Sequence, residues 1–200
     1  MVKLNKIYTR TGDDSSSGLV DGSRLPKHDA LFAAIGDVDE LNSVIGVAIL
    51  ALGDDGTMAR RLTVIQNDLF DLGADLATPA GAGNDPFAPG EMALRIIAEQ
   101  VARLEVEIDD MNVSLSPLTS FILPGGSAAA AHLHVARSTA RRAERSAVAA
   151  AGGRALNPSA LSYLNRLSDW LFVAARAANS AKVYGGSGDV LWVPGASRTG

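Results

Sequence analysis

The chain has 200 residues, of which 47% are hydrophobic and 20% charged, and its net charge is −4. These values are typical of one globular domain that buries a sizeable core without disulfides. The absence of cysteine excludes disulfides, thiolate metal sites and cysteine nucleophiles. The acidic balance argues against a nucleic-acid binder, which usually has a strongly basic face. We also expect no signal peptide, no membrane span and a cytoplasmic location, because the longest apolar run, residues 44–52, is too short to cross a bilayer.

The first part of the chain, residues 1–27, has no helical period and is rich in Gly, Ser, Thr and Asp. This composition fits either a structured loop or a disordered arm. The rest follows the period of amphipathic helices. We predict helices at about 29–52, 57–77, 90–111, 127–151 and 157–182. Because short helix–helix loops favour antiparallel neighbours, the sequence predicts an all-α, antiparallel five-helix bundle.

We interpret the chain as one domain, residues 1–200, with the bundle at 28–182 and a tail at 183–200. Ser127 and Asn157 are predicted N-caps of the fourth and fifth helices, and Pro158 suits a first helical position. Regularly spaced aliphatic residues mark the core faces of the first three helices. They are Leu31, Ile35, Val38, Leu41, Ile45 and Ile49, then Ile65, Leu69, Leu72 and Leu76, then Leu94, Ile97, Val101, Leu104, Ile108 and Met111.

The fourth helix has an unusual charge pattern. At about 100° per residue, one arc of this helix holds His134, Arg137, Arg141, Glu144 and Arg145. Stacked guanidinium groups repel one another unless an anion or carboxylates neutralise them, and they bind phosphate oxygens in bidentate pairs. The pattern therefore favours a polyphosphate site, with a solvated basic face as the alternative. A ridge that lets another helix approach lies beside this arc: Ala136, Ala140, Ala143 and Ala147.

Polar residues on two other helices could complete such a site. One side of the fifth helix holds Asn165, Asp169, Phe172 and Arg176. Asp169 could pair with an arginine of the fourth helix, and Asn165 could bind a ribose or a phosphate. A buried polar cluster that fixes helix register is the alternative. Asp39 of the first helix could neutralise an arginine of a neighbouring helix or subunit.

Six segments between Thr9 and Asp169 occur in one characteristic order, and the resemblance that they indicate extends over residues 7–192. They read TRTGDDSSSGLVDGSRLPK, GDVDELNS, IQNDLFDLGADLATP, FILPGG, RRAER and LNRLSD. Together they resemble the PduO-type family of ATP:cob(I)alamin adenosyltransferases. The resemblance implies a homotrimeric five-helix bundle with active sites between subunits. It also implies that the cobalt of reduced cobalamin attacks the ribose 5′-carbon of ATP, so that triphosphate leaves and adenosylcobalamin forms.

The resemblance further implies roles for individual residues. The ATP-binding set is Thr9, Arg10, Thr11, Gly12, Ser17, Lys27, Asn42, Arg141, Glu144 and Asn165, with Mg²⁺ held at Glu144. The catalytic set is Arg137, Arg141, Asp39 and Asp169, in which Asp39 pairs with Arg137 across the subunit interface. The cobalamin-binding set is Phe121, Leu191 and Trp192, in which Phe121 presses on the lower face of the corrin. Arg142 and Arg145 are expected to form structural pairs.

The chain departs from the family pattern at four positions. Ser15 stands where glycine is usual, Ser17 replaces threonine but keeps the hydroxyl, Leu31 stands where many members have arginine, and Ile35 where an aromatic residue is common. If position 15 requires a positive φ, serine costs about 1 kcal/mol there. The change at Ser15 is the feature that favours a different class of function, a non-catalytic cobalamin-binding protein that delivers its cofactor to a mutase. A cobalamin reductase or a B12-dependent mutase is the transient partner that the resemblance implies.

Overall fold

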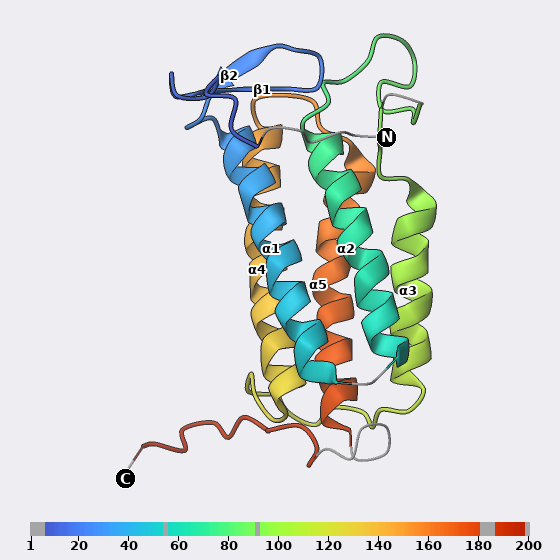
Figure 1. Ribbon diagram of the computed structural model, residues 1–200. Coiled ribbons are helices and arrows are strands. Elements are labelled where there is room, and N and C mark those ends of the chain that lie inside the picture. The colour runs from blue at the N-terminus through green and yellow to red at the C-terminus, as the bar shows by residue number, and fades with distance from the viewer. Residues whose placement is uncertain (1–6, 54–55, 91–92, 181–186, 199–200) are drawn as a thin grey trace.

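The computed structural model describes residues 7–53, 56–90, 93–180 and 187–198. Within these residues the chain forms five helices and one short β-hairpin, which confirms the predicted helical bundle. The helices lie side by side, with the hairpin above one end of the bundle and the C-terminal segment below the other (Figure 1). No helix in this part of the chain is long and apolar enough to cross a membrane. The helices are α1 Ala30–Leu52, α2 Gly56–Leu76, α3 Ala98–Asn112, α4 Ala128–Ala151 and α5 Pro158–Asn179.

Side chains cap the beginnings of three helices. Asp29 caps α1 with its carboxylate, Ser127 caps α4 with its hydroxyl and Asn157 caps α5 with its side-chain amide. Each side-chain oxygen accepts a backbone N–H that has no partner within its helix. The two N-caps predicted from the sequence, and Pro158 at the start of α5, are thus confirmed. The predicted end of α5 at residue 182 lies outside the described residues.

The third helix begins later than its apolar period predicted. The chain before it is extended, and Asp75 of α2 fixes that shape. Arg95 Nη1 donates to Asp75 Oδ1 at 2.7 Å, and the backbone N–H of Ile96 donates to Oδ2 at 2.8 Å. As a result Ile96 is buried, whereas Leu94 is 53% exposed and Ile97 38%. The prediction of Leu94 and Ile97 as core residues was wrong, because a buried ion pair overrides local periodicity.

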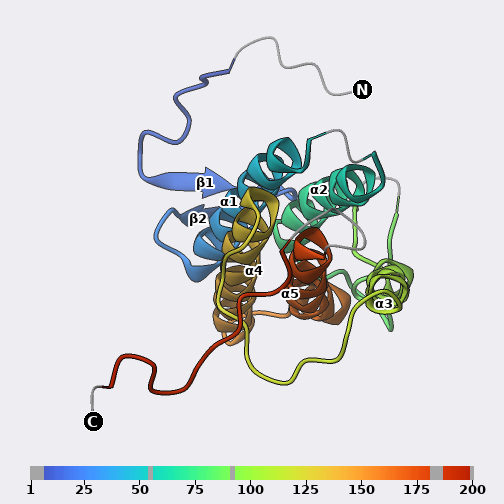
Figure 2. The ribbon, with the colours of Figure 1, turned by 90° about the horizontal axis from the view of Figure 1, so that it is seen from below.

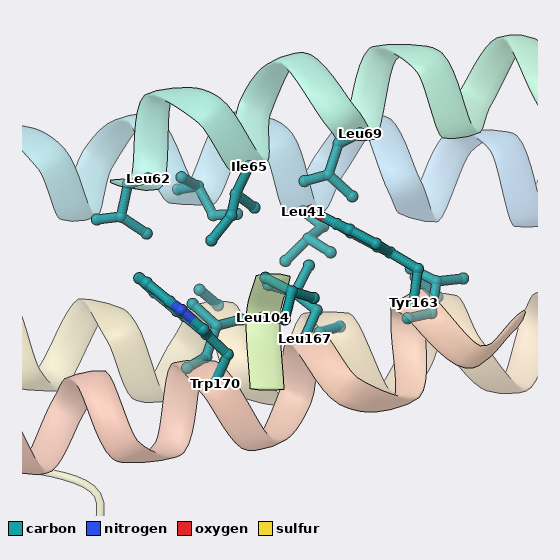
Figure 3. Packing of buried hydrophobic residues seen from close by; sticks show 14 of the residues in the cluster. Leu41, Leu62, Ile65, Leu69, Leu104, Tyr163, Leu167 and Trp170 are labelled. Carbon is teal, nitrogen blue, oxygen red and sulfur yellow. The ribbon is translucent and has the colours of Figure 1, made fainter. Parts of the chain in front are cut away.

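The packing of the helices follows the distribution of small and large side chains. α4 packs along α1 and α5, α2 packs on α1, and α3 packs on α5 (Figure 2). The predicted alanine ridge of α4 is fully buried, as close helix approach requires: Ala136, Ala140, Ala143 and Ala147. The predicted seam of α2 is also buried, and large side chains from four helices meet in the core (Figure 3). These are Leu41, Leu62, Ile65, Leu69, Leu104, Tyr163, Leu167 and Trp170.

The N-terminal segment forms an antiparallel hairpin of two short strands, β1 Ser16–Gly18 and β2 Arg24–Pro26. Leu19 packs against the core, and the backbone N–H of Val20 donates to the carbonyl of Ala77 at 3.1 Å. Of the two alternatives that composition left open, the described part of this segment is therefore a structured loop. The hairpin was not predicted because strands this short show no readable alternation.

Candidate active site

The outer face of α4 carries two arginines, Arg137 and Arg141, that form no ion pair among the described residues. Arg137 is half-buried, and its Nε has no hydrogen-bond partner among the described residues. Burial, and then the neighbouring Arg141, lower the pKa of the Arg137 guanidinium, which nevertheless stays protonated at neutral pH. Arg141 is exposed, and none of the ion pairs in the described part of the chain involves it. This face therefore has the charge to bind an anion.

A surface pocket of about 360 Å³ lies between α4 and α5, lined by Arg141, Glu144, Arg145, Val148 and Asn165. Asn165 Nδ2 donates to Glu144 Oε1 at 2.8 Å, and Arg145 donates to the backbone carbonyl of Arg141 at 2.9 Å. Three of the predicted ATP-binding residues thus meet in one pocket. Two guanidinium groups, a carboxylate and an amide are suited to a phosphate-bearing ligand with an associated metal ion.

The other arginine of this stretch, Arg142, is bound to α1 instead. Its Nε lies 3.0 Å from Asp37 Oδ1, and its Nη2 pairs with Glu40. Asp37 also accepts a hydrogen bond from Ser146. The structural pair predicted for Arg142 is confirmed, whereas the one predicted for Arg145 is not found, because Arg145 binds a backbone carbonyl and forms no ion pair among the described residues. The sequence did not single out Asp37, because several acidic residues in this part of α1 looked equally suitable.

Asp39 and Asn42 lie in a different place. They line a groove of about 470 Å³ between α1 and α2, together with apolar side chains such as Phe70. Asn42 is buried and donates to the carbonyl of Gln66 at 3.1 Å, and Gln66 returns a bond to the carbonyl of Asn42. No ion pair between described residues joins Asp39 to Arg137. Their pairing was expected between subunits, and it stays a prediction.

The contacts of Asp169 differ from the expected ones. Its Oδ2 accepts from Arg166 of the same helix at 2.8 Å, and Arg166 also binds Glu105 of α3 at 3.0 Å. A pair with an arginine of α4 is absent from the described contacts, so that expectation was wrong. An arginine three positions away on one helix is within easy reach of a carboxylate. A catalytic role for Asp169 stays a prediction.

The predicted phosphate-binding loop is compact. The hydroxyls of Thr9 and Thr11 are 2.9 Å apart, and Lys27 lies so close to Gly12 that a Cβ there would be 3.0 Å from Nζ. Ser15 has a φ of 65°. The positive φ that would make serine costly at this usual glycine position is thus present.

Two arginines that the sequence did not single out support this loop. Arg24 donates to the backbone carbonyl of Thr11 at 2.6 Å and to Ser16 Oγ at 2.9 Å. Arg154, after α4, lies 2.8 Å from both carboxylate oxygens of Asp29, where the loop passes into α1. Arg24 lies within the first quoted segment, but it was given no role there. No short motif marks Arg154, because it acts on a segment that is distant in sequence.

At the opposite end of the bundle, the segment before α4 pairs with the C-terminal segment. The backbone N–H of Leu123 donates to the carbonyl of Val190 at 2.7 Å, and that of Trp192 to the carbonyl of Phe121 at 2.8 Å. The rings of Phe121 and Trp192 meet edge to face, 6.0 Å apart. Phe121 is 78% exposed, and Leu191 and Trp192 are nearly half exposed. The predicted corrin-binding residues therefore form one exposed apolar surface.

Comparison with known proteins shows the family of the chain. The family model described as cobalamin adenosyltransferase matches residues 7–178. The chain belongs to this family. The corrinoid adenosyltransferase of Mycobacterium tuberculosis is 50% identical, over 99% of this chain and 98% of the relative. That of Bacillus subtilis is 41% identical, over 92% of this chain and 91% of the relative.

A solved structure is similar over nearly the whole chain. It is a variant PduO-type ATP:corrinoid adenosyltransferase from Lactobacillus reuteri, complexed with cobalamin and ATP. Its TM-score is 0.81 at 37% identity, over 94% of this chain and 99% of the other. The predicted family and fold of this adenosyltransferase are thus confirmed.

The adenosyltransferase also contains a buried polar network within one of the segments that carried the resemblance. Asp68 of α2 accepts from Gln100 at 2.8 Å and from the Tyr163 hydroxyl at 2.7 Å, and it pairs with Arg103. Burial, and then the charge of Asp68, raise the pKa of Tyr163 well above its usual value. The phenol therefore stays protonated and keeps donating. The network joins α2, α3 and α5 and forms the scaffold behind the site.

Proposed function

We propose that this chain transfers the 5′-deoxyadenosyl group of ATP to the cobalt of a reduced corrinoid. An electron pair of cobalt(I) forms the bond to the ribose 5′-carbon. The bond from that carbon to the phosphate oxygen breaks, and triphosphate leaves with its electrons, so that cobalt(I) becomes cobalt(III). The observation that supports the proposal is the pair of arginines on α4, Arg137 and Arg141, that form no ion pair with a described carboxylate, together with the pocket that Arg141 lines with Glu144 and Asn165.

Arg141 and Arg137 serve the leaving group in this proposal. The triphosphate gains negative charge as the carbon–oxygen bond breaks. A guanidinium that is already in place stabilises that charge without reorganisation, which is commonly the largest contribution to catalysis. Arg137 is half-buried, so its charge acts through less water than an exposed arginine would. The loop residues Thr9, Thr11, Gly12 and Lys27 hold the phosphates from the other side.

Glu144 is suited to hold Mg²⁺ with the phosphates. One of its oxygens is bonded to Asn165, which orients the carboxylate and leaves the second oxygen for another ligand. Mg²⁺ commonly binds one or two carboxylates together with substrate phosphates. When bound, the ion would neutralise part of the phosphate charge. Arg141 and Arg145, which line the same pocket, would repel a cation that arrived without phosphate.

We expect the corrin to bind at the exposed aromatic pair. Phe121 and Trp192 offer an apolar face on which a corrin ring would be shielded from water. Contact with the lower face of the corrin would exclude the lower axial ligand and leave four-coordinate cobalt(II), which is easier to reduce. We expect Phe121→Ala to spare ATP binding and to lower the four-coordinate cobalt(II) population. The cobalt(II) absorption and paramagnetic resonance spectra measure this, and unchanged spectra would contradict the role.

The proposed assembly is a homotrimer with its sites between subunits. Arg137 lacks an anionic partner within the described chain, and Asp39 lies in a groove beside the exposed ring of Phe70. We therefore expect Asp39→Arg and Arg137→Asp each to weaken assembly and activity, and the double reversal to restore assembly. Light scattering after size-exclusion chromatography gives the subunit number. Equal assembly in all four proteins would refute the pair.

Ser15 gives a smaller prediction. Ser15→Gly removes the strain of a positive φ but adds freedom to the unfolded chain, so stability should change by at most about 1 kcal/mol. We expect a modestly lower KM for ATP, within about tenfold. Ser15→Ala is the matched control, because it removes the hydroxyl and keeps the strained backbone. If Ala lowers the KM as Gly does, the hydroxyl and not the backbone limits ATP binding.

One experiment tests the function itself. The protein is mixed anaerobically with cob(I)alamin and MgATP, and light-sensitive adenosylcobalamin and released triphosphate are measured. We expect equal amounts of both. Bound cobalamin without either product would refute the transferase and support the delivery protein.

A further inference from the structure

Arg176, near the end of α5, connects two segments that are distant in sequence. Its Nε donates to Asp189 Oδ2 at 2.9 Å, and its Nη2 donates to the backbone carbonyl of Ser116 at 2.7 Å. The side chain of Arg176 is 9% exposed and that of Asp189 15%. One guanidinium therefore binds the segment that precedes α4 and also the C-terminal segment.

These two segments are the ones that carry the corrin surface. Asp189 stands directly before Val190, whose carbonyl accepts from Leu123. Two residues further on, Trp192 accepts from Ser120 Oγ at 2.8 Å through its carbonyl. Arg176 itself contacts neither Phe121 nor Trp192 in the described contacts, so any influence on them must pass through the backbone of the two segments.

The geometry suits an arginine and no shorter or simpler cation. The planar guanidinium presents donors in different directions from one rigid group, whereas an ammonium is a single point charge. Hydrogen bonds that involve a charged group are stronger than neutral ones, and low exposure reduces their screening by water. Truncation of either partner would leave the other charge largely buried without its counter-ion. The contact is thus strong enough to fix the position of the C-terminal segment.

We propose that Arg176, through Asp189 and Ser116, is a positioning residue that holds the two halves of the corrin surface in register. The proposal rests on the proposed function, because it concerns the site at which the corrinoid binds. It places corrin affinity partly under the control of a residue that does not touch the corrin. A purely structural ion pair would instead affect both substrates, or neither.

The first test needs no substrate. Of the two tryptophans, Trp170 is fully buried and Trp192 is 44% exposed, so acrylamide quenching of fluorescence in the full chain reports mainly on Trp192. We expect Arg176→Met and Asp189→Asn to increase quenching and to shift the emission to the red. Arg61→Met is the matched control, because it removes an arginine–aspartate pair, with Asp110, between α2 and α3. Quenching equal to that of the wild type in both variants would overturn the proposal.

The second test separates the two substrates. We expect the Kd for cob(II)alamin to rise about tenfold in Arg176→Met and Asp189→Asn, because binding must then order segments that were fixed before. The Kd for MgATP, measured by calorimetry, should stay within about twofold. Arg176→Lys keeps a positive charge near Asp189 but cannot donate to Asp189 and Ser116 from one planar group. Its Kd for cob(II)alamin should therefore lie between those of the wild type and Arg176→Met. Equal weakening of both substrates, or of neither, would overturn the positioning role.

Two further measurements keep these outcomes distinct. Circular dichroism confirms that each variant is folded, and Asp189→Asn, which lies outside the bundle, decides the result if Arg176→Met does not fold. If the wild-type chain binds no cob(II)alamin, the proposed function fails, while the quenching result still supports or overturns the anchoring of the C-terminal segment.

Discussion

The charged groups on the two sides of α5 differ in whether they have a partner of opposite charge. Toward α3, buried acidic groups are matched: Asp68 pairs with Arg103, and Asp75 pairs with Arg95. Toward α4, Arg137 has no carboxylate partner in the described part of the chain. Figure 2 shows α5 between these two neighbours. Both sides contain charged residues, but those toward α3 have partners of opposite charge within the described chain, whereas Arg137 does not.

This difference separates scaffold from site. A buried charge without a counter-ion is costly, so a fold retains one chiefly where something else supplies the opposite charge. On the α3 side the chain supplies it, and the ion pairs fix how the helices meet. On the α4 side the opposite charge has to come from a ligand or a neighbouring subunit. Mutations on the two sides should therefore affect different properties, stability on one and turnover on the other.

The largest effect is expected at Asp75. Its carboxylate binds Arg95, the backbone of Ile96 and the amide of Asn157. Asp75→Ala leaves the buried guanidinium unpaired and should lower the free energy of unfolding by about 3–5 kcal/mol. Urea denaturation followed by circular dichroism measures this. Asp110→Ala, at the exposed partner of Arg61, should cost less than about 1 kcal/mol. Equal losses of unfolding free energy in Asp75→Ala and Asp110→Ala would contradict the view that the buried ion pairs on the α3 side stabilise the scaffold.

On the α4 side the expected effect is on turnover. Arg141→Ala and Arg137→Ala should each lower kcat by about 100-fold or more, as the loss of a charge-stabilising donor does. The unfolding free energy of Arg141→Ala should change by no more than about 0.5 kcal/mol, because its side chain is exposed. Arg142→Ala is the matched control on the same helix, since its partners are Asp37 and Glu40. Its kcat should stay within about threefold, and a loss like that of Arg141 would contradict the division among these arginines.

The smallest effect concerns His134, which neighbours Arg137. Its ring is buried, and neither nitrogen has a hydrogen-bond partner among the described residues. Burial, and then the charge of Arg137, lower the pKa of His134 below 6.5, while Asp189 acts in the opposite direction. The neutral ring therefore contributes stability that is fully present above pH 6.5 and is lost as the pH falls through the lowered pKa.

The measurement is the free energy of unfolding between pH 7.5 and 5, in wild type and in His134→Phe. We expect the wild type to lose stability toward acid and the variant to lose less. His132→Phe, at another histidine of α4, controls for the removal of one imidazole. If the free energy of unfolding falls equally with pH in wild type and in His134→Phe, the protonation of His134 does not destabilise the fold, and the expectation is wrong.

The sequence predicted what local patterns determine. Ser127 and Asn157 cap their helices because an N-cap depends on a few adjacent residues. The seam of α2 and the alanine ridge of α4 follow from spacing alone. The start of α3 did not, because Arg95 and Ile96 are held by Asp75, which stands in another helix. A partner that is distant in sequence leaves no periodic signal.

The candidate site divides in the same way. Arg141, Glu144 and Asn165 meet as predicted, because each position is set by a regular helix. Asp169 binds Arg166 and not α4, since the choice between two nearby arginines depends on side-chain geometry. The supports of the phosphate loop, Arg24 and Arg154, were not predicted for the same reason.

The way in which the N-terminal hairpin is attached has a consequence for nucleotide affinity. Fixing the backbone of one residue costs about 1–2 kcal/mol of conformational entropy. The stretch from Ser16 to Asp29 is fixed by contacts within the chain, through Val20 at Ala77 and through Arg154 at Asp29. Association with ATP therefore need not supply that entropy. It follows that substitutions at Arg154 or at Leu19, which lie outside the phosphate pocket, can weaken ATP binding. They would release the hairpin in the ATP-free protein, so that ATP binding would have to order it.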